Sequence, residues 1–143
     1  MALVSVTKCH GTGNDFIILD ARGRPGLPYA KLASAGLARA NLTGARLNDA
    51  DLTRASLARA DVSGARLRGT DLTETNFAES NLTGAKLTGA TVTRTVFYRA
   101  NLTETDLTNA RWSQDVPVPD GWIRDPVSDS LRRVSTEANE CRN

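Results

Sequence analysis

The feature that most constrains this chain is a period of five residues that runs from residue 30 to residue 110. Sixteen successive positions at this spacing, beginning at Leu32 and ending at Leu107, all carry large apolar side chains. Two residues before each of them stands a small side chain: the seventeen positions from Ala30 to Ala110 hold twelve alanines, four threonines and one serine. A repeat of this regularity is interpreted before local secondary structure, because it determines the whole architecture.

A five-residue period fits neither regular element. On an α-helix a step of five residues turns about 140° past a full revolution, so the leucines would spiral round the rod without forming a face. On a straight strand an odd step places successive leucines on opposite faces. The conflict disappears if the chain turns a corner once in each repeat, because the small residue and the leucine then both point inward. We therefore predict a cornered coil, in which the other three residues of each repeat face outward or form the bend.

The glycines indicate how many sides close one coil. Gly44, Gly64 and Gly84 are twenty residues apart, and so are Gly69 and Gly89. Basic residues recur at the same spacing, in the columns Arg39, Arg59 and Arg99 and Arg46, Arg66 and Lys86. A four-sided coil of twenty residues is therefore favoured over a triangle of fifteen. Two adjacent sides carry Gly, Asp or Asn at most corners, where a positive φ costs little; the other two carry Ser, Arg or Glu, which predicts a different turn type there.

The repeats resemble those of the pentapeptide-repeat family, whose motif is Ala-(Asp/Asn)-Leu-X-X. The motif stands here as AlaAsnLeuThrGly at 40–44, AlaAspLeuThrArg at 50–54 and AlaAsnLeuThrGlu at 100–104. The resemblance implies an all-β fold, a right-handed quadrilateral β-helix of about four coils, in which the inward leucines stack as ladders. Each coil would add about 4.8 Å along the axis.

Three segments are expected on this basis: an N-terminal cap at 1–29, the β-helix at 30–112, and a C-terminal cap with a polar tail at 113–143. A solenoid needs closed ends, because the edges of its terminal coils would otherwise pair with another chain. PheIleIleLeu at 16–19 is expected to form a strand that caps the first coil. At the other end, Trp112 is expected to cover the last leucine layer, and Trp122 and Ile123 to fold back over it. Stacking of the two tryptophans on a carbohydrate is the alternative.

Residues 8–24 resemble the opening of diaminopimelate epimerase through HisGly-x-GlyAsnAspPhe at 10–16. The resemblance implies a substrate-binding role for Asn14. That enzyme uses two cysteines, a thiolate that removes a proton and a thiol that supplies one. Cys9 precedes the motif and Cys141 lies in ThrGluAlaAsnGluCys, so neither matches a catalytic cysteine. We therefore expect an inactive fragment joined to a repeat domain.

No catalytic, cofactor-binding or metal-binding constellation is evident in the sequence. GlyThrGly at 11–13 lacks the third glycine of a dinucleotide-binding fingerprint, and no lysine and Ser/Thr pair completes a phosphate loop. The lone His10 has no cluster of cysteines or carboxylates beside it that would hold a metal. The chain is therefore expected to be a non-enzymatic module without a cofactor.

Charge and hydropathy restrict the classes of partner and the location. The chain has 18 Lys+Arg against 16 Asp+Glu, a net charge of +2, so binding to nucleic acid is not expected from charge alone. No apolar run reaches the length of a membrane span, about 18 residues. No basic segment followed by an apolar one marks a secretory signal, and the two distant cysteines indicate free thiols. These observations predict a cytoplasmic protein that does not bind membranes.

The outward positions predict a contact with another protein. In a stack of coils, residues twenty apart lie about one strand spacing from each other. One side is therefore expected to carry a narrow apolar strip flanked by arginines, made of Ala38, Ala58, Ala78, Val96, Tyr98, Arg39, Arg59 and Arg99. Such a strip fits a protein partner or a second copy of the chain. The column of Arg46, Arg66 and Lys86 is expected to be solvated, or to be offset by an anion or a carboxylate.

Some pentapeptide-repeat proteins act on DNA gyrase by imitating duplex DNA, which makes gyrase an alternative partner. Such mimicry requires a strongly acidic surface, whereas residues 30–112 hold eleven Lys+Arg against eight Asp+Glu. The charge therefore disfavours gyrase. A fragment derived from the epimerase, with residual ligand binding through Asn14, is a further alternative.

Overall fold

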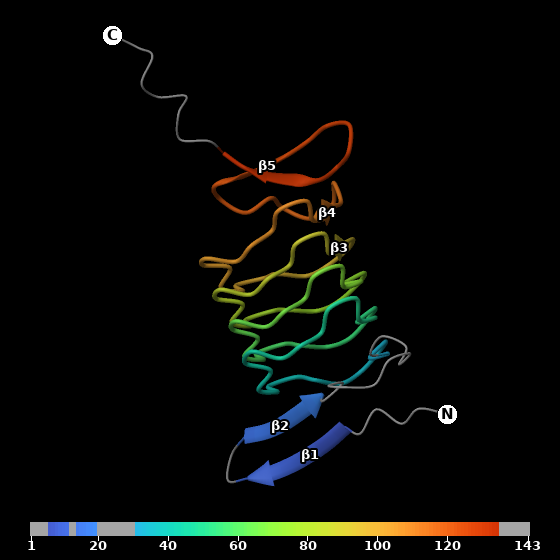
Figure 1. Cartoon of the computed structure of the whole chain (residues 1–143), viewed down its shortest axis with the longest axis vertical. Coiled ribbons are helices and arrows are strands. Elements are labelled where there is room, and N and C mark those ends of the chain that lie inside the picture. The colour runs from blue at the N-terminus through green and yellow to red at the C-terminus, as the bar shows by residue number, and fades with distance from the viewer. Residues whose placement is uncertain (1–5, 12–13, 20–30, 135–143) are drawn as a thin grey trace.

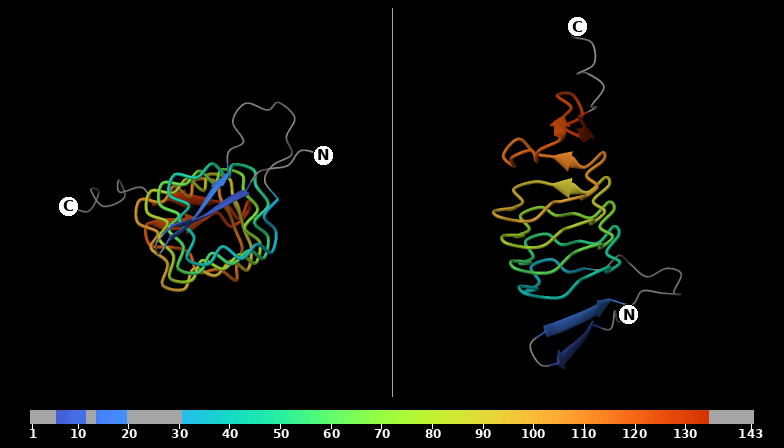
Figure 2. Two further views of the ribbon diagram at one scale, coloured as in Figure 1. Left: turned by 90° about the horizontal axis from the view of Figure 1, so that it is seen from below. Right: turned by 90° about the vertical axis from the view of Figure 1, so that its left-hand side faces the viewer.

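The computed structural model describes residues 6–11, 14–19 and 31–134, with the backbone alone in the first two ranges. The repeats wind into a stack of coils (Figure 1), and the view along the axis in Figure 2 shows their four-sided outline. The β-helical solenoid that the five-residue period predicts is the observed architecture. No helix within the described ranges has the length and apolar character that a membrane crossing requires.

Each coil takes twenty residues, as the glycine spacing predicts. Parallel bridges join Asn41 to Asp61, Asp61 to Asn81 and Asn81 to Asn101. The N–H of Asp61 donates to the carbonyl of Ala40 at 2.9 Å, so the ladder connects each coil to the next. The regular strands within the stack are short: β3 (Thr91–Val92) pairs in parallel with β4 (Arg111–Trp112).

The core consists of the inward columns that the sequence predicts. The central leucines and the alanines two residues before them are buried, and Leu52, Leu72 and Leu87 have no exposed surface. Burial of one leucine side chain contributes about 1.5–3 kcal/mol, so these columns dominate stability. Nearer the C-terminal end the core becomes aromatic: the ring of Phe97 stacks between Phe77 of its own column and Trp112 of the neighbouring column, with centroid distances of 5.5 and 5.4 Å.

Four threonines replace alanine at the small inward position without leaving an unpaired polar atom. Their buried hydroxyl groups donate to main-chain carbonyls of the preceding coil at 2.7–2.9 Å, in the pairs Thr70 with Leu47, Thr75 with Leu52, Thr95 with Leu72, and Thr105 with Leu82. Among the described residues, every buried side-chain polar atom has a hydrogen-bond partner. The hydroxyls therefore add links between coils where an unpaired group would cost stability.

All sixteen corners from Ser34 to Asn109 have a positive φ, between 51° and 67°. At fifteen of these corners the N–H that follows the corner donates to the carbonyl three residues earlier, as Ala35 does to Leu32 at 2.9 Å; the corner at Arg94 lacks this hydrogen bond. A positive φ at the third residue of such a turn is the signature of type II. The prediction of a different turn type at the Ser, Arg and Glu corners was wrong.

Hydrogen bonds between coils stabilise most of these corners. The N–H of Arg39 donates to the carbonyl of Ala58 at 2.9 Å, and that of Arg59 donates to Ala78 at 2.8 Å. The twelve corners from Ser34 to Gly89 are held in this way by the next coil, whatever their side chains. A non-glycine residue in this region of φ costs about 1–2 kcal/mol, and the hydrogen bonds between coils offset that cost.

A hairpin of β5 (Trp122–Arg124) and β6 (Leu131–Arg133) closes the C-terminal end of the stack (Figure 1). The N–H of Leu131 donates to the carbonyl of Ala110 at 2.9 Å, and the side chain of Leu131 is buried. Trp112 is also buried, as predicted, and its indole N–H donates to the carbonyl of Val116 at 3.0 Å. Leu131 and Trp112 thus complete the core.

Ile123 does not fold back over the core as predicted, because it is 37% exposed. In the hairpin Arg124 lies opposite Leu131, while Ile123 lies opposite Arg132. Successive residues of a strand face opposite sides, so Trp122 shares the inner face with Leu131 and Ile123 lies on the outer face. Trp122 packs against the core in agreement with the prediction.

The N-terminal strands β1 (Val6–Gly11) and β2 (Asn14–Leu19) form an antiparallel hairpin, so the strand expected at 16–19 is present. The backbone of Cys9 pairs with that of Phe16. The expected capping of the first coil, and the roles of the Asn14, Cys9 and Cys141 side chains, lie outside what the structure describes.

Candidate functional site

The eight residues predicted to form a partner contact lie along one side of the coil, which we call the Tyr98 side. Parallel bridges join Gly36, Ser56, Asn76 and Val96 into one column. The hydrogen bond between the N–H of Glu79 and the carbonyl of Tyr98, at 2.8 Å, continues the neighbouring alanine column into Tyr98. The structure therefore brings together Ala38, Ala58, Ala78, Val96, Tyr98, Arg39, Arg59 and Arg99. Their contact with a partner stays a prediction.

Tyr98 and Val96 are the large apolar side chains exposed on this side, at 65% and 45%. The guanidinium carbon of Arg99 lies 5.9 Å from the centre of the Tyr98 ring, within the range of a cation–π contact. Arg59 donates from Nε to Oε2 of Glu79 at 3.2 Å. A carboxylate therefore interrupts the arginine column along the edge of this side.

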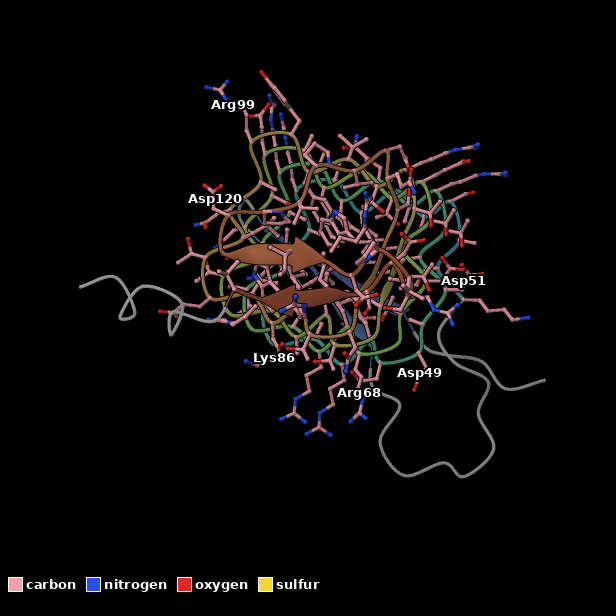
Figure 3. The ribbon with its side chains drawn as sticks, turned by 90° about the horizontal axis from the view of Figure 1, so that it is seen from above. Asp49, Asp51, Arg68, Lys86, Arg99 and Asp120 are labelled. Atoms are coloured by element: carbon pink, nitrogen blue, oxygen red, sulfur yellow. The ribbon has the colours of Figure 1, made fainter. Side chains whose placement is uncertain are left out.

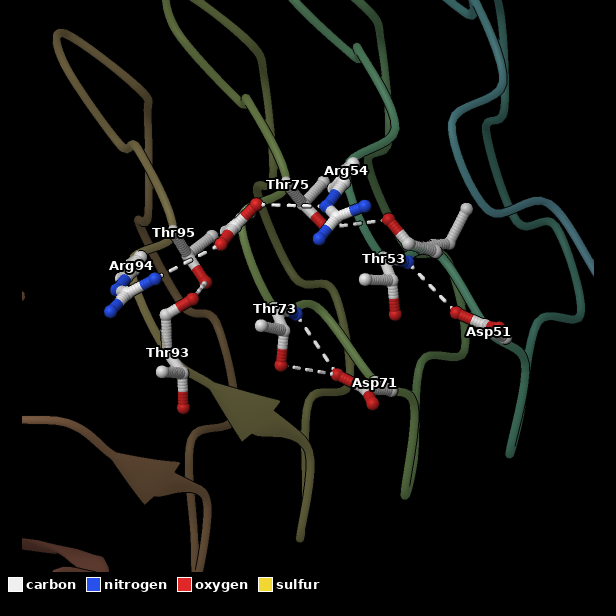
Figure 4. Close-up of polar contacts among 11 residues, drawn as sticks. Asp51, Thr53, Arg54, Asp71, Thr73, Thr75, Thr93, Arg94 and Thr95 are labelled. Carbon is white, nitrogen blue, oxygen red and sulfur yellow. Dashed lines mark hydrogen bonds and ion pairs between the residues drawn. The ribbon is translucent and has the colours of Figure 1, made fainter.

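A second ion-paired column, the corner column, consists of Arg54, Glu74 and Arg94 (Figure 4). Arg54 donates from Nε to Oε2 of Glu74 at 3.0 Å, and Arg94 donates from Nη1 to Oε1 at 3.2 Å. These hydrogen bonds, that from Arg54 foremost, hold the pKa of Glu74 below its ordinary value despite some opposing desolvation. The Glu74 side chain is 34% exposed, so solvent weakens both pairs. The corner column alternates in sign and its charges offset one another.

The opposite arrangement occurs on another side, the basic side, which carries Arg46, Arg66, Arg68 and Lys86. Parallel bridges place Arg46 beside Arg66, Arg66 beside Lys86, and Lys86 beside Asp106, which ends the column. All four side chains are exposed, and Figure 3 shows Arg68 and Lys86 projecting from the side of the coil opposite Arg99. None of the four forms an ion pair with another residue in the described ranges.

The Asp and Asn residues of the motif have a structural role. Their Oδ1 atoms accept hydrogen bonds at 2.9–3.1 Å from the backbone N–H two residues later, as Asp51 does from Thr53 and Asp71 from Thr73 (Figure 4). This is the Asx-turn geometry that favours these residues before a bend. At Asp106 the hydroxyl of Thr108, followed by its backbone N–H, lowers the pKa of the carboxyl. Carboxylates engaged in this way stabilise the coil.

The described residues contain no group of three or more His, Cys, Asp or Glu that could hold a metal ion. Since the side chain of Asn14 lies outside the described part, the candidate sites are the Tyr98 side and the basic side. The sequence analysis named Arg46, Arg66 and Lys86 as a column but missed Arg68. The signal was available, because Arg68 occupies the outward position directly after an inward leucine.

Comparison with known proteins adds the following findings. The family model for pentapeptide repeats matches residues 35–73 and 75–111, with 8 copies. A solved pentapeptide repeat protein from Nostoc Pcc 7120 is 35% identical with a TM-score of 0.55, over 56% of this chain and 66% of that one. A pentapeptide repeat protein from the cyanobacterium Cyanothece 51142 is 29% identical with a TM-score of 0.60, over 66% of this chain and 65% of that one. A comparison with curated proteins finds no match.

The chain spans slightly less than two thirds of the length of those two solved proteins. The resemblance of residues 8–24 to diaminopimelate epimerase is not shown by these comparisons and stays a hypothesis. The family model, by contrast, covers more than half of the chain and coincides with the stacked coils. The protein therefore belongs to the pentapeptide-repeat family.

Proposed function

We propose that this protein is a non-catalytic scaffold that binds another protein through the Tyr98 side. The observation that carries the proposal is the exposure of Tyr98, 65%, next to Val96, 45%, on a side whose other residues in the Tyr98 column are alanines. A flat row of alanines lets a partner approach the backbone closely, and a single large ring then supplies most of the contact area. Tyrosine is enriched among the few residues that dominate binding energy in protein interfaces.

The arginines along the edge of this side suit the rim of such an interface. Arg99 lies beside the Tyr98 ring, while Arg59 is held by Glu79. A polar rim around an apolar centre is the usual arrangement of a protein contact. The partner is either a foreign protein with an acidic rim or a second copy of the chain, joined through a symmetric contact.

Mimicry of duplex DNA, the alternative that would point to gyrase, receives no support from these columns. It would require rows of exposed carboxylates, whereas most Asp side chains of the motif are engaged in turns. Glu74 and Glu79 are paired with arginines.

The test is the substitution Tyr98→Asp, compared with wild type and with Val127→Asp as a matched control. Val127 is 92% exposed and lies in the C-terminal cap, outside the repeats. Sedimentation at high concentration is expected to show a dimer for wild type and Val127→Asp and a monomer for Tyr98→Asp, if the partner is a second copy. If all three proteins sediment as monomers, the self-association version is wrong. The proposal then requires a foreign protein that binds wild type and Val127→Asp but does not bind Tyr98→Asp. Unfolding of Tyr98→Asp would refute the outward assignment of this side.

A further inference from the structure

On the basic side, residues of like charge occupy neighbouring positions in successive coils, although the corner column shows that neighbouring positions can carry opposite charges. In a parallel ladder, directly neighbouring positions lie about 4.8 Å apart, and like charges at that spacing destabilise the pair. Arg46, Arg66 and Lys86 occupy such positions in three successive coils. At the corner column the same spacing is occupied by alternating signs, with Glu74 between two arginines. An external anion would relieve the repulsion on the basic side.

We propose that the basic side binds an extended acidic segment of a partner protein, whose carboxylates lie between its arginines. The molecule contains a precedent for the contact: Glu74 accepts hydrogen bonds from Arg54 and Arg94, which project from the coils on either side. On the basic side the carboxylate would come from the partner. Guanidinium groups match carboxylates in shape and form charge-assisted hydrogen bonds with them.

The spacing of the cations fits an extended chain. Arg66 and Arg68 are two residues apart on a short extended side, a separation of about 6.6 Å. Alternate side chains of an extended partner repeat at the same distance. Asn48 lies beside these cations, and its side-chain amide can donate hydrogen bonds to the partner. At the C-terminal end of the column Asp106 follows Lys86 and accepts hydrogen bonds from the hydroxyls of Thr88 and Thr108, so the partner is expected to bind chiefly at Arg46, Arg66 and Arg68.

Two other anionic surfaces fit less well. Single-stranded nucleic acid binds through aromatic side chains on which its bases stack, and the outward positions of this side carry none. A membrane surface is held by apolar side chains that enter the lipid together with basic ones, and the outward positions of the basic side are polar or charged or are glycine. An acidic protein segment requires neither feature.

This inference does not depend on the Tyr98 side, because the two surfaces lie on opposite sides of the coil (Figure 3). Tyr98→Asp is therefore expected to leave binding at the basic side unchanged. Failure of one proposal is in this way distinguishable from failure of the other.

The experiment measures fluorescence anisotropy of a short labelled peptide with glutamate at alternate positions, titrated with the full chain at low salt. We expect saturable binding, and none for the same peptide with glutamine in place of glutamate. The double variant Arg46→Gln/Arg66→Gln is expected to bind about tenfold more weakly, as is Arg68→Gln/Lys86→Gln. The matched control Arg111→Gln/Arg132→Gln removes the same charge from exposed residues elsewhere and is expected to bind like wild type.

Equal binding of the two peptides, or equal weakening by the control pair, would overturn the proposal, because net charge alone would then explain the result. Tighter binding of a single-stranded oligonucleotide of equal charge would assign the side to nucleic acid instead. Tighter binding of vesicles that contain phosphatidylserine would assign it to a membrane. Since all the substituted residues are exposed, unchanged circular dichroism is expected to show that each variant is folded.

Discussion

Two columns of charged residues run through the same stack with the same spacing but differ in the order of their charges. The corner column, Arg54, Glu74 and Arg94, alternates in sign, whereas the basic column, Arg46, Arg66 and Lys86, carries three positive charges in succession. In the first, a glutamate receives hydrogen bonds from arginines in the coils on both sides. In the second, three cations follow one another without an ion-pair partner among the described residues. The stack could have accommodated alternating signs at both places. The difference indicates that the corner column serves the fold, while the basic column serves a contact outside it.

The two columns also differ in their backbone. Arg54, Glu74 and Arg94 have positive φ values of 59°, 58° and 51°. Arg46, Arg66 and Lys86 lie in extended bridge positions, which any L-residue adopts readily. Charged residues at the corners therefore carry a conformational cost that those on the sides do not, and the ion pairs partly offset it.

The largest expected effect comes from breaking the core that holds both columns in place. Leu72 is fully buried, between Leu52 and Val92 in one inward column. Leu72→Lys is expected to unfold the repeats, with a loss of more than about 4 kcal/mol, because an unpaired charge would lie between apolar layers. Circular dichroism during thermal melting measures the loss. Leu72→Met, which conserves volume, is the control and is expected to cost less than about 1.5 kcal/mol. An unchanged melting curve for Leu72→Lys would refute the inward assignment.

A smaller effect is expected from exchanging glycine and a charged residue at corners of one column. Gly84 has a φ of 67°, and a Cβ built there would meet nothing within 4 Å. Gly84→Ala is therefore expected to lower the free energy of unfolding by about 1 kcal/mol through the backbone alone. Glu104, with a φ of 56°, stands at the next corner of that column. Glu104→Gly is expected to raise stability by less, since glycine also loses more freedom on folding. Urea denaturation tests both, and a loss of stability for Glu104→Gly would show that the corners are not strained.

The smallest effect is expected from exchanging the charge patterns of the two columns. Glu74→Arg makes the corner column uniformly basic and is expected to lower the melting temperature. Arg66→Glu makes the basic column alternate in sign and is expected to raise it. Both shifts are expected to shrink in about 1 M salt, where charges on the surface are screened beyond about 3 Å. Shifts of the same sign for the two variants, or shifts independent of salt, would contradict the comparison.

Predictions from the sequence succeeded where a residue's environment follows from its own position in the repeat. Leu72 and the other central leucines are buried, and Tyr98 and Arg39 are exposed, because the five-residue period assigns each position inward or outward. The twenty-residue coil followed from Gly44, Gly64 and Gly84 for the same reason, since the pattern that sets each corner recurs once per coil. The family itself followed from the same repeats and is confirmed.

What the sequence by itself determined about this protein is thus the repeat, its inward columns and the length of one coil. The tertiary structure holds the positive φ of Arg54 with a hydrogen bond from its N–H to the carbonyl of Thr73 in the next coil. It decided that Leu131 rather than Ile123 closes the core, because the register of the terminal hairpin sets which residues face inward. It also paired Glu74 with arginines twenty residues away on both sides, and left Arg46, Arg66 and Lys86 next to one another, with Asp106 following Lys86 at the C-terminal end. Periodicity is a local property of the chain, whereas these features depend on which segment the stacking places beside another.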